Sequence, residues 1–263
     1  MGKFHTLMSY ARMGIRLGAD WRSKWLLATM LARHKIMRAL GLKDQRSYQA
    51  AVKVGDREHR LHFRAQDIFI LNEIFVTNPY VPAWLADSPP QRILDLGAHI
   101  GLATLQFKTH WPEAAVYCFE PDPDNFRLLQ LNTQGLAGVT LRQEAVGGQS
   151  GEAILYIRPT RHSASSLLPP GDRDAVEARP CRVRSLDEII TEIGVPDFCK
   201  FDVEGSEFEI FAQSRFAADI RCLVGEIKVT KRSLEDFLAL FPRHEVRVRS
   251  IMPKMHIVYL WRR

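Results

Sequence analysis

The chain has 263 residues, of which 46% are hydrophobic and 25% are charged, and its formal net charge is +6. This composition is typical of a soluble globular protein and argues against a disordered or fibrous chain. No apolar run approaches the roughly 20 residues that a membrane-spanning helix needs, and the N-terminus has no secretory leader pattern, so we expect a cytoplasmic protein.

The positive charge is concentrated at the N-terminus. Residues 1–55 contain eleven Lys and Arg side chains against two acidic ones, which gives them a net charge of +9, and the rest of the chain carries −3. The main body therefore does not have the basic surface that nucleic-acid binding requires.

The first 50 residues form a basic segment with a helical pattern over 6–43, because apolar side chains recur there at helical spacing among Lys and Arg. This segment could serve as a cap, a lid, a contact with a second copy of the chain, or a weak contact with a membrane surface. Residues 51–90 predict a hairpin that turns at Gly55-Asp56, followed by a short helix near 67–75.

From residue 91 to residue 263, short apolar runs alternate with helical patterns. Strands are predicted near 92–96, 115–120, 139–143, 198–202, 221–227, 245–251 and 255–261, with added strands near 153–157 and 181–184. Alternation of this kind predicts an α/β fold with a mostly parallel seven-stranded sheet, in which the last two strands pair antiparallel. The four cysteines have no metal-type spacing and are predicted to be free thiols.

A parallel sheet binds ligands at the carboxyl ends of its strands, where this sequence places acids and glycines. The first strand ends in Asp95, and a turn from Gly97 to Gly101 then leads into a helix whose free N–H groups and close backbone suit a ligand. Glu120 follows the second strand, 23 residues after Gly97, where an acid accepts hydrogen bonds from ribose hydroxyls.

Two nucleoside cofactors fit this arrangement, NAD(P) and S-adenosylmethionine. The turn lacks the middle glycine of a dinucleotide site, and Asp95 would repel a pyrophosphate but suits the amino group of S-adenosylmethionine. We therefore favour S-adenosylmethionine, while an NAD(P)-linked oxidoreductase stays as an alternative. Further contacts are predicted for His99, for Glu144 at the adenine amino group, and for Ala145 beside the adenine.

Three blocks resemble the FkbM family of S-adenosylmethionine-dependent methyltransferases: Asp95–Gly101, Phe119–Phe126 and Lys200–Glu207. The third block, Lys-x-Asp-x-Glu-Gly-x-Glu, is the most specific, and the similarity spans roughly residues 67–226. The chain departs from the family pattern at His99, where the family usually has Asn. The resemblance implies a Rossmann-like class I methyltransferase fold and O-methylation of a hydroxyl group on a secondary metabolite, a sugar or a related glycan.

A hydroxyl acceptor benefits from a base that removes its proton, because an alcohol is a weak nucleophile at neutral pH. Asp202 and Glu204 are the preferred catalytic residues, since the tip of the fourth strand faces the cofactor's methyl group in this fold. Other candidates are Glu226, His99 and His162. Alternatively, Glu204 and Glu207 orient the loop and cap the next helix, or Asp202, Glu204 and Glu226 hold a divalent ion, although no metal ligand is assigned.

The loop from Arg158 to Arg179 is polar and is predicted to lie over the pocket, where it could close on the acceptor. A non-enzymatic alternative is a scaffold protein that keeps a nucleoside pocket without chemistry. The retained acids Asp95, Glu120, Asp202 and Glu204 argue against this alternative.

Overall fold

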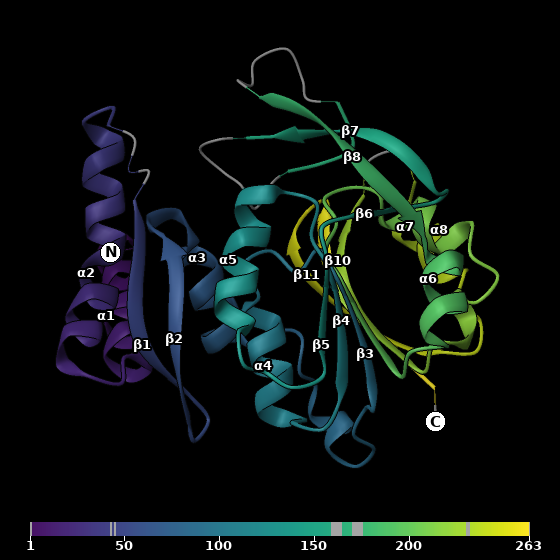
Figure 1. Cartoon of the computed structure of the whole chain (residues 1–263), viewed down its shortest axis with the longest axis horizontal. Helices are drawn as coiled ribbons and strands as arrows, with labels where there is room; N and C mark the ends of the chain where they lie inside the picture. The colour runs from purple at the N-terminus through teal and green to yellow at the C-terminus, as the bar shows by residue number, and fades with distance from the viewer. Residues whose placement is uncertain are drawn as a thin grey trace.

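The computed structural model describes residues 2–42, 44, 46–158, 165–169, 176–229 and 232–262, with side chains from residue 8 onward. A central sheet carries helices on both faces, and the N-terminal helices and hairpin lie beyond one of these helical layers (Figure 1). Strands and helices alternate along the chain, and helices cover both faces of the sheet, as in an α/β protein.

The central sheet has seven strands in the order β11-β12-β10-β9-β3-β4-β5. They are β3 (Arg92–Leu96), β4 (Ala115–Phe119), β5 (Val139–Arg142), β9 (Phe198–Phe201), β10 (Cys222–Lys228), β11 (Glu245–Met252) and β12 (Met255–Trp261). β12 pairs antiparallel with both β10 and β11, and the pairs among β3, β4, β5, β9 and β10 are parallel. The predicted Rossmann-like sheet with its antiparallel strand near the C-terminus is confirmed.

The strand order reverses between β3 and β9, because the chain first adds β4 and β5 on one side of β3 and then crosses to the other side. A reversal of this kind leaves a crevice at the carboxyl ends of the two strands, which is where open α/β sheets bind ligands. The glycine turn follows β3, and the Lys200–Glu207 block begins in the last two residues of β9 and continues into the loop after it, so both flank this crevice.

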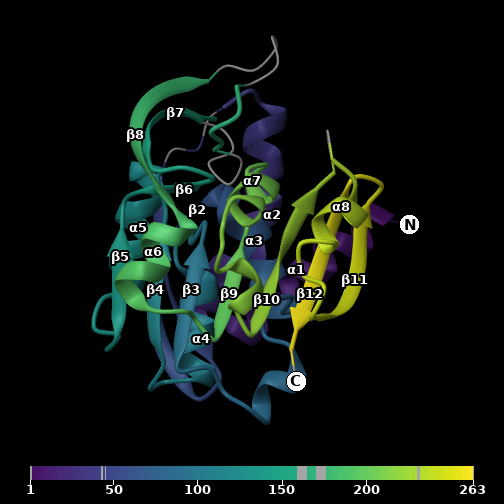
Figure 2. The ribbon, with the colours of Figure 1, turned by 90° about the vertical axis from the view of Figure 1, so that its right-hand side faces the viewer.

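Each face of the sheet has its own hydrophobic core, because successive strand residues point to opposite faces. Ile93 packs with α4 (Leu102–His110) and α5 (Pro123–Thr133), whereas Leu94 belongs to the core of the other face. That second core includes residues of α6 (Leu186–Ile193), α7 (Glu207–Ala212) and the segment around α8 (Leu234–Leu238). Figure 2 shows α6, α7 and α8 in front of the sheet and α4 behind it.

The N-terminal segment contains two helices, α1 (Gly2–Leu17) and α2 (Trp21–Ala39), in place of one continuous helical stretch. The break is at Gly18-Ala19-Asp20, where the Asp20 carboxylate accepts a hydrogen bond from the Ser23 N–H and caps α2. The helices pack closely, since a Cβ atom at Gly14 would lie 2.3 Å from the Ala28 nitrogen.

The predicted hairpin is confirmed as β1 (Ser47–Val54) and β2 (Arg57–Arg64), joined at Gly55-Asp56. A short helix follows in three parts, a 3₁₀ turn (Ala65–Asp67), α3 (Ile68–Asn72) and a π-helical turn (Glu73–Thr77) that ends at Asn78 with φ of 47°. Two further 3₁₀ turns cover Ala83–Ala86 and Ala217–Asp219.

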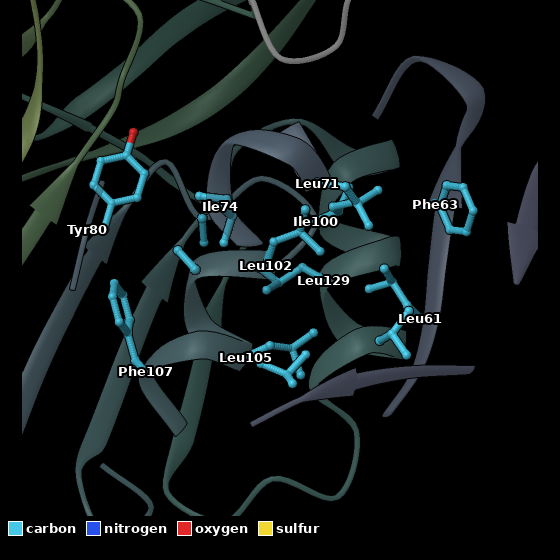
Figure 3. Close-up of a cluster of buried hydrophobic side chains, with 14 of the residues drawn as sticks. Leu61, Phe63, Leu71, Ile74, Tyr80, Ile100, Leu102, Leu105, Phe107 and Leu129 are labelled. Atoms are coloured by element: carbon cyan, nitrogen blue, oxygen red, sulfur yellow. The ribbon is translucent and has the colours of Figure 1, made fainter. Parts of the chain in front are cut away.

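The hairpin is fixed to the core by apolar packing and by one amide side chain. Figure 3 shows Leu61 of β2 beside Leu129 of α5, within a cluster that extends to Ile100 of the glycine turn. Asn132 of α5 pairs with the backbone N–H and carbonyl of His62 and also donates to the Ile100 carbonyl. The hairpin and the glycine turn are therefore held in one arrangement by a single buried amide.

A second, three-stranded sheet begins where β5 ends, with the order β6-β8-β7. Its strands are β6 (Ala145–Gly147), β7 (Gly151–Ile157) and β8 (Glu177–Ser185), so the two added strands are confirmed and a third joins them. It lies at the top of Figure 1, beyond the ends of the central strands. All four cysteines are free, and no helix in the described part of the chain is long and apolar enough to cross a membrane.

Candidate active site

A cavity of about 1330 Å³ lies at the carboxyl ends of β3, β4, β9 and β10. It is larger than the roughly 300–1,000 Å³ of a typical small-molecule pocket, so it has room for more than one ligand. Seven of the predicted site residues line it: Gly97, His99, Glu120, Glu144, Ala145, Asp202 and Glu204. Asp95 and Gly101 are not among the residues that line it.

Glu120 is buried at the end of β4, and three donors hold its carboxylate. Its Oε2 atom accepts from the His99 N–H at 2.8 Å, and its Oε1 atom accepts from the Asp122 N–H and from the Asn125 amide at 3.2 Å. Burial and the neighbouring Asp122 charge raise the pKa of Glu120 to about 7. Three of its roughly four lone-pair positions thus have protein donors, and the role of Glu120 in binding ribose stays a prediction.

The two glycines of the turn have different roles. Gly97 has φ of 73°, and a Cβ atom there would lie 1.9 Å from the Asp202 carbonyl oxygen, so glycine is needed for the close approach of the loops after β3 and β9. Gly101 starts α4 with φ of 86° and faces Leu129 of α5. The first glycine therefore shapes the cavity wall, and the second shapes the helix start.

His99 adopts φ of 52°, in the left-handed region, where His, Asn and Asp are tolerated better than most side chains. This left-handed backbone explains why His can occupy the position where the family usually has Asn. Burial lowers the pKa of His99 to about 4, and its Nε2 atom lies 3.8 Å from Asp67 Oδ1. A pKa this low makes the ring a poor proton acceptor, so His99 is a weak candidate for the base.

Arg64 and Asp67 are site residues that the sequence did not reveal. The Arg64 guanidinium forms hydrogen bonds with the Asp67 carboxylate and, at 2.6 Å, with the Asn125 side-chain carbonyl. Asp67 also accepts from the Arg64 N–H. This chain of bonds connects the end of β2 to Asn125, the partner of Glu120, so the hairpin helps to orient the side of the cavity that contains Glu120.

Asp95 forms a buried ion pair with Lys200 across the two strands at the switch point. The Lys200 Nζ atom lies 3.1 Å from Asp95 Oδ1 and 2.5 Å from the Gly97 carbonyl oxygen, and Thr104 donates to Asp95 Oδ2 at 2.8 Å. Asp95 has no exposed surface. Its carboxylate is thus directed at Lys200 and Thr104, and a direct contact with the cofactor's amino group stays a prediction.

Asp202, Tyr80 and Glu73 converge on the other side of the cavity. The Tyr80 hydroxyl donates to Asp202 Oδ2 at 3.3 Å, and burial together with the Asp202 charge raises the pKa of Tyr80. Glu73 lies on the π-helical turn, a geometry frequent at functional sites, and burial and the Asp202 charge raise its pKa. No sequence motif indicated Tyr80 or Glu73, because neither is near Asp202 along the chain.

Glu204 also lines the cavity, but its charge is compensated by an ion pair with Lys228. Its φ of 58° and the bond from the Ser166 hydroxyl to its carbonyl fix the loop after β9. Glu207 accepts from the Gly205 N–H and orients the same loop. Within the described ranges, no group of three or more His, Cys, Asp or Glu side chains has a metal-binding arrangement.

The predicted adenine end lies at the start of the small sheet. Ala145 is buried as the first residue of β6, and the Glu144 carboxylate lies 3.4 Å from Arg182 and 3.8 Å from Arg184. Leu167, in the described part of the loop, lines the cavity. His162 is outside the described residues.

Comparison with known proteins identifies a family match. The family model described as "Methyltransferase FkbM domain" matches residues 95–248, which is more than half of the chain. This range covers the glycine turn, Glu120 and the whole Lys200–Glu207 block.

Curated relatives match about half of this chain. Methyltransferase SdnD of Sordaria araneosa is 29% identical over 54% of this chain and 66% of its own length, and "Methyltransferase 1" of Beauveria bassiana is 32% identical over 46% and 45%. The antimetabolite synthetase AmbE of Pseudomonas aeruginosa is 28% identical over 54% of this chain and 8% of its own length. The chain thus spans less than two thirds of each of these relatives.

Solved structures of similar fold include the fibrillarin pre-rRNA processing protein of Methanococcus jannaschii, with a TM-score of 0.45 and 14% identity over 84% of this chain and 85% of that one. Fibrillarin from Aeropyrum pernix, solved with natively bound S-adenosylmethionine, has a TM-score of 0.41 and 15% identity over 65% and 66%. Both TM-scores are below 0.5, so the assignment rests on the family match.

Proposed function

The chain belongs to the FkbM methyltransferase family, and we propose that it is an S-adenosylmethionine-dependent O-methyltransferase that acts on a hydroxyl group of a secondary metabolite or a sugar-type small molecule. One observation carries the proposal. A single cavity joins Glu120, at the end of β4, to Asp202, at the end of β9, and these two strands flank β3 on either side. The residues that we assign to a nucleoside site and to a proton acceptor thus line the same cavity.

S-adenosylmethionine supplies an activated methyl group when it is bound, and the protein positions the reactants and removes a proton. Glu120 would bind the ribose, while the Gly97–His99 turn would lie along the amino-acid end. Asp202 would accept the proton of the acceptor hydroxyl as the carbon–oxygen bond forms. Its partner Tyr80 holds the carboxylate in place. Glu73 is a second carboxylate in the same part of the cavity, which we call the acceptor region.

The wall of the acceptor region supports a small polar ligand. Apolar side chains lie beside acids there, since the lining includes Ile251, Met252, Met255 and Ile257 together with Glu73 and Glu226. Carboxylates accept hydrogen bonds from hydroxyl groups, and Lys228 and Arg249 line the same part of the cavity, so the wall offers both acceptors and donors to a polar ligand. The name of the AmbE relative, an antimetabolite synthetase, also favours a small-molecule acceptor over a macromolecule.

The cofactor is tested by thermal unfolding with S-adenosylhomocysteine, NAD and NADP in parallel. At about 100 times its Kd, a ligand specific to the folded state adds about 2.7 kcal/mol of stability, which should raise the Tm by about 5–10 °C for a chain of this size. We expect this shift with S-adenosylhomocysteine alone. No shift at millimolar S-adenosylhomocysteine would reject the proposal, and a shift with NAD would favour the oxidoreductase.

Glu120→Gln is expected to weaken S-adenosylhomocysteine binding at least about tenfold, because a neutral amide is a poorer acceptor than a carboxylate for the ribose hydroxyls. Isothermal titration calorimetry measures the change. Glu152→Gln, an exposed acid on β7, is the matched control and should bind normally.

The same experiment has a defined pH dependence. The pKa of Glu120 is raised to about 7 in the free protein, and the ribose hydroxyls stabilise the ionised form, so the ligand affinity should fall as the pH decreases through 7. The Glu120→Gln variant should show a flat profile over this range. Unchanged affinity in the variant would contradict the ribose role of Glu120.

A further inference from the structure

We propose that the outer face of α2 binds the surface of an anionic lipid membrane. This outer face is defined by four large apolar side chains: Trp21, Trp25, Ile36 and Leu40. Figure 1 shows α1 and α2 at the edge of the molecule, beyond the hairpin and away from the central sheet. The proposal does not depend on the identity of the cofactor or of the acceptor.

These side chains are unusually exposed for their size. Trp21 and Trp25 are 73% and 71% exposed, and Leu40 and Ile36 are 66% and 59% exposed. At 3.6 residues per turn, the four positions fall within about 100° of the helix circumference and extend about 28 Å along it. They form a stripe of two exposed pairs, one at each end of the helix, with the half-buried Thr29 and Ala32 between them and Leu40 as the C-cap residue. Isolated apolar side chains are normal on protein surfaces, whereas pairs aligned on one face are not.

The packing of α2 in the fold does not account for this stripe. The opposite face of the helix is already buried, through Leu27, Met30 and Leu31. A surface helix of a globular protein normally presents polar residues on the side away from its core. The helix α2 is instead apolar on both sides, so its outer face has the composition of a contact surface.

Basic side chains flank the stripe on both sides. Arg22, Lys24 and Lys35 are exposed, and the Arg22 guanidinium lies 5.4 Å from the centre of the Trp21 ring. The only acid in residues 1–43 is Asp20, whose carboxylate caps the helix. The neighbouring helix α1 also contributes exposed basic side chains, Arg12 and Arg16, and one exposed apolar side chain, Ile15.

This combination fits an anionic lipid surface better than a second copy of the chain. Tryptophan is enriched at membrane–water interfaces, and Lys and Arg are attracted to anionic headgroups while their neighbours insert shallowly. A two-fold symmetric dimer through the same face would bring two basic borders together, which is unfavourable. Charge complementarity therefore selects the lipid surface.

The test uses the full chain with vesicles of phosphatidylcholine alone or mixed with phosphatidylglycerol. We expect co-sedimentation with the mixed vesicles, weakened by added salt, and a blue shift of tryptophan emission on binding. The double variant Trp21→Ser/Trp25→Ser should bind at least about tenfold more weakly and lose the blue shift, since it removes most of the aromatic area that inserts. Arg22→Glu/Lys35→Glu should abolish the preference for mixed vesicles.

The matched control is Ile154→Ser/Arg247→Glu, which changes an exposed apolar and an exposed basic residue elsewhere. Circular dichroism and S-adenosylhomocysteine binding check that every variant is folded. Equal sedimentation with both vesicle types, or equal binding by the tryptophan variant, would refute the proposal. A dimer in solution that dissociates in the tryptophan variant would show that the face binds a second copy instead.

Discussion

Asp202→Asn is expected to lower kcat for methyl transfer at least about 100-fold, since general-base catalysis contributes about 10²–10⁴-fold, and to leave S-adenosylhomocysteine affinity within about twofold. The amide is nearly isosteric with the carboxylate and can still accept from the Tyr80 hydroxyl. The backbone bond from the Asp202 N–H to the Leu96 carbonyl is also unaffected. The variant therefore removes the proton acceptor and keeps the shape of the site.

The measurement is transfer of a labelled methyl group from S-adenosylmethionine into a metabolite extract, which also serves to find the acceptor. Binding of S-adenosylhomocysteine is measured alongside, because loss of both signals would indicate a damaged site. Tyr80→Phe is the graded comparison. It removes only the hydrogen bond to Asp202 and should reduce the rate by about tenfold.

Glu73→Gln distinguishes between the two carboxylates of the acceptor region. Its burial and the Asp202 charge raise the pKa of Glu73, which makes its ionised form a better proton acceptor than an ordinary glutamate. If Asp202→Asn keeps full activity and Glu73→Gln loses it, the base is Glu73 and the assignment to Asp202 is wrong. Glu204 is a weaker candidate, because Lys228 neutralises its charge.

Lys200→Met is expected to lower the free energy of unfolding by about 3–5 kcal/mol, the cost of leaving a buried charge without its partner. The side chains of Asp95 and Lys200 are 0% and 4% exposed. Methionine fills most of the space of the lysine stem but offers no charge to Asp95. Denaturant titration gives the change, provided that unfolding is two-state.

The double variant Asp95→Asn/Lys200→Met separates the ion pair from simple packing. It removes both charges, so it should recover a large part of the stability lost in Lys200→Met. The comparison variant Lys228→Met breaks the partly exposed pair with Glu204 and should cost about 1 kcal/mol or less. If the Lys200 and Lys228 variants lose the same free energy of unfolding, the buried ion pair does not contribute more to stability than the partly exposed one.

The sequence determined the sheet, and seven of the nine site residues that it predicted line the cavity. Short apolar runs that alternate with helical patterns have few arrangements other than a doubly wound parallel sheet. Because parallel strands end at the same edge of the sheet, the residues after Leu96, Phe119 and Phe201 had to lie close together at that edge. Glu120 and Asp202 could be predicted for this reason. Their positions follow from chain order and strand direction, which local patterns encode.

Only the tertiary structure decided which partner each charged group has. Asp95 faces Lys200, and Tyr80 reaches Asp202 across 122 residues of sequence, because contacts between distant segments depend on how the layers pack. The left-handed backbone of His99 and the exposure of the stripe on α2 also became visible only in the tertiary structure. A sequence pattern shows that a side chain is apolar or charged, but its burial and its partner are properties of the assembled fold.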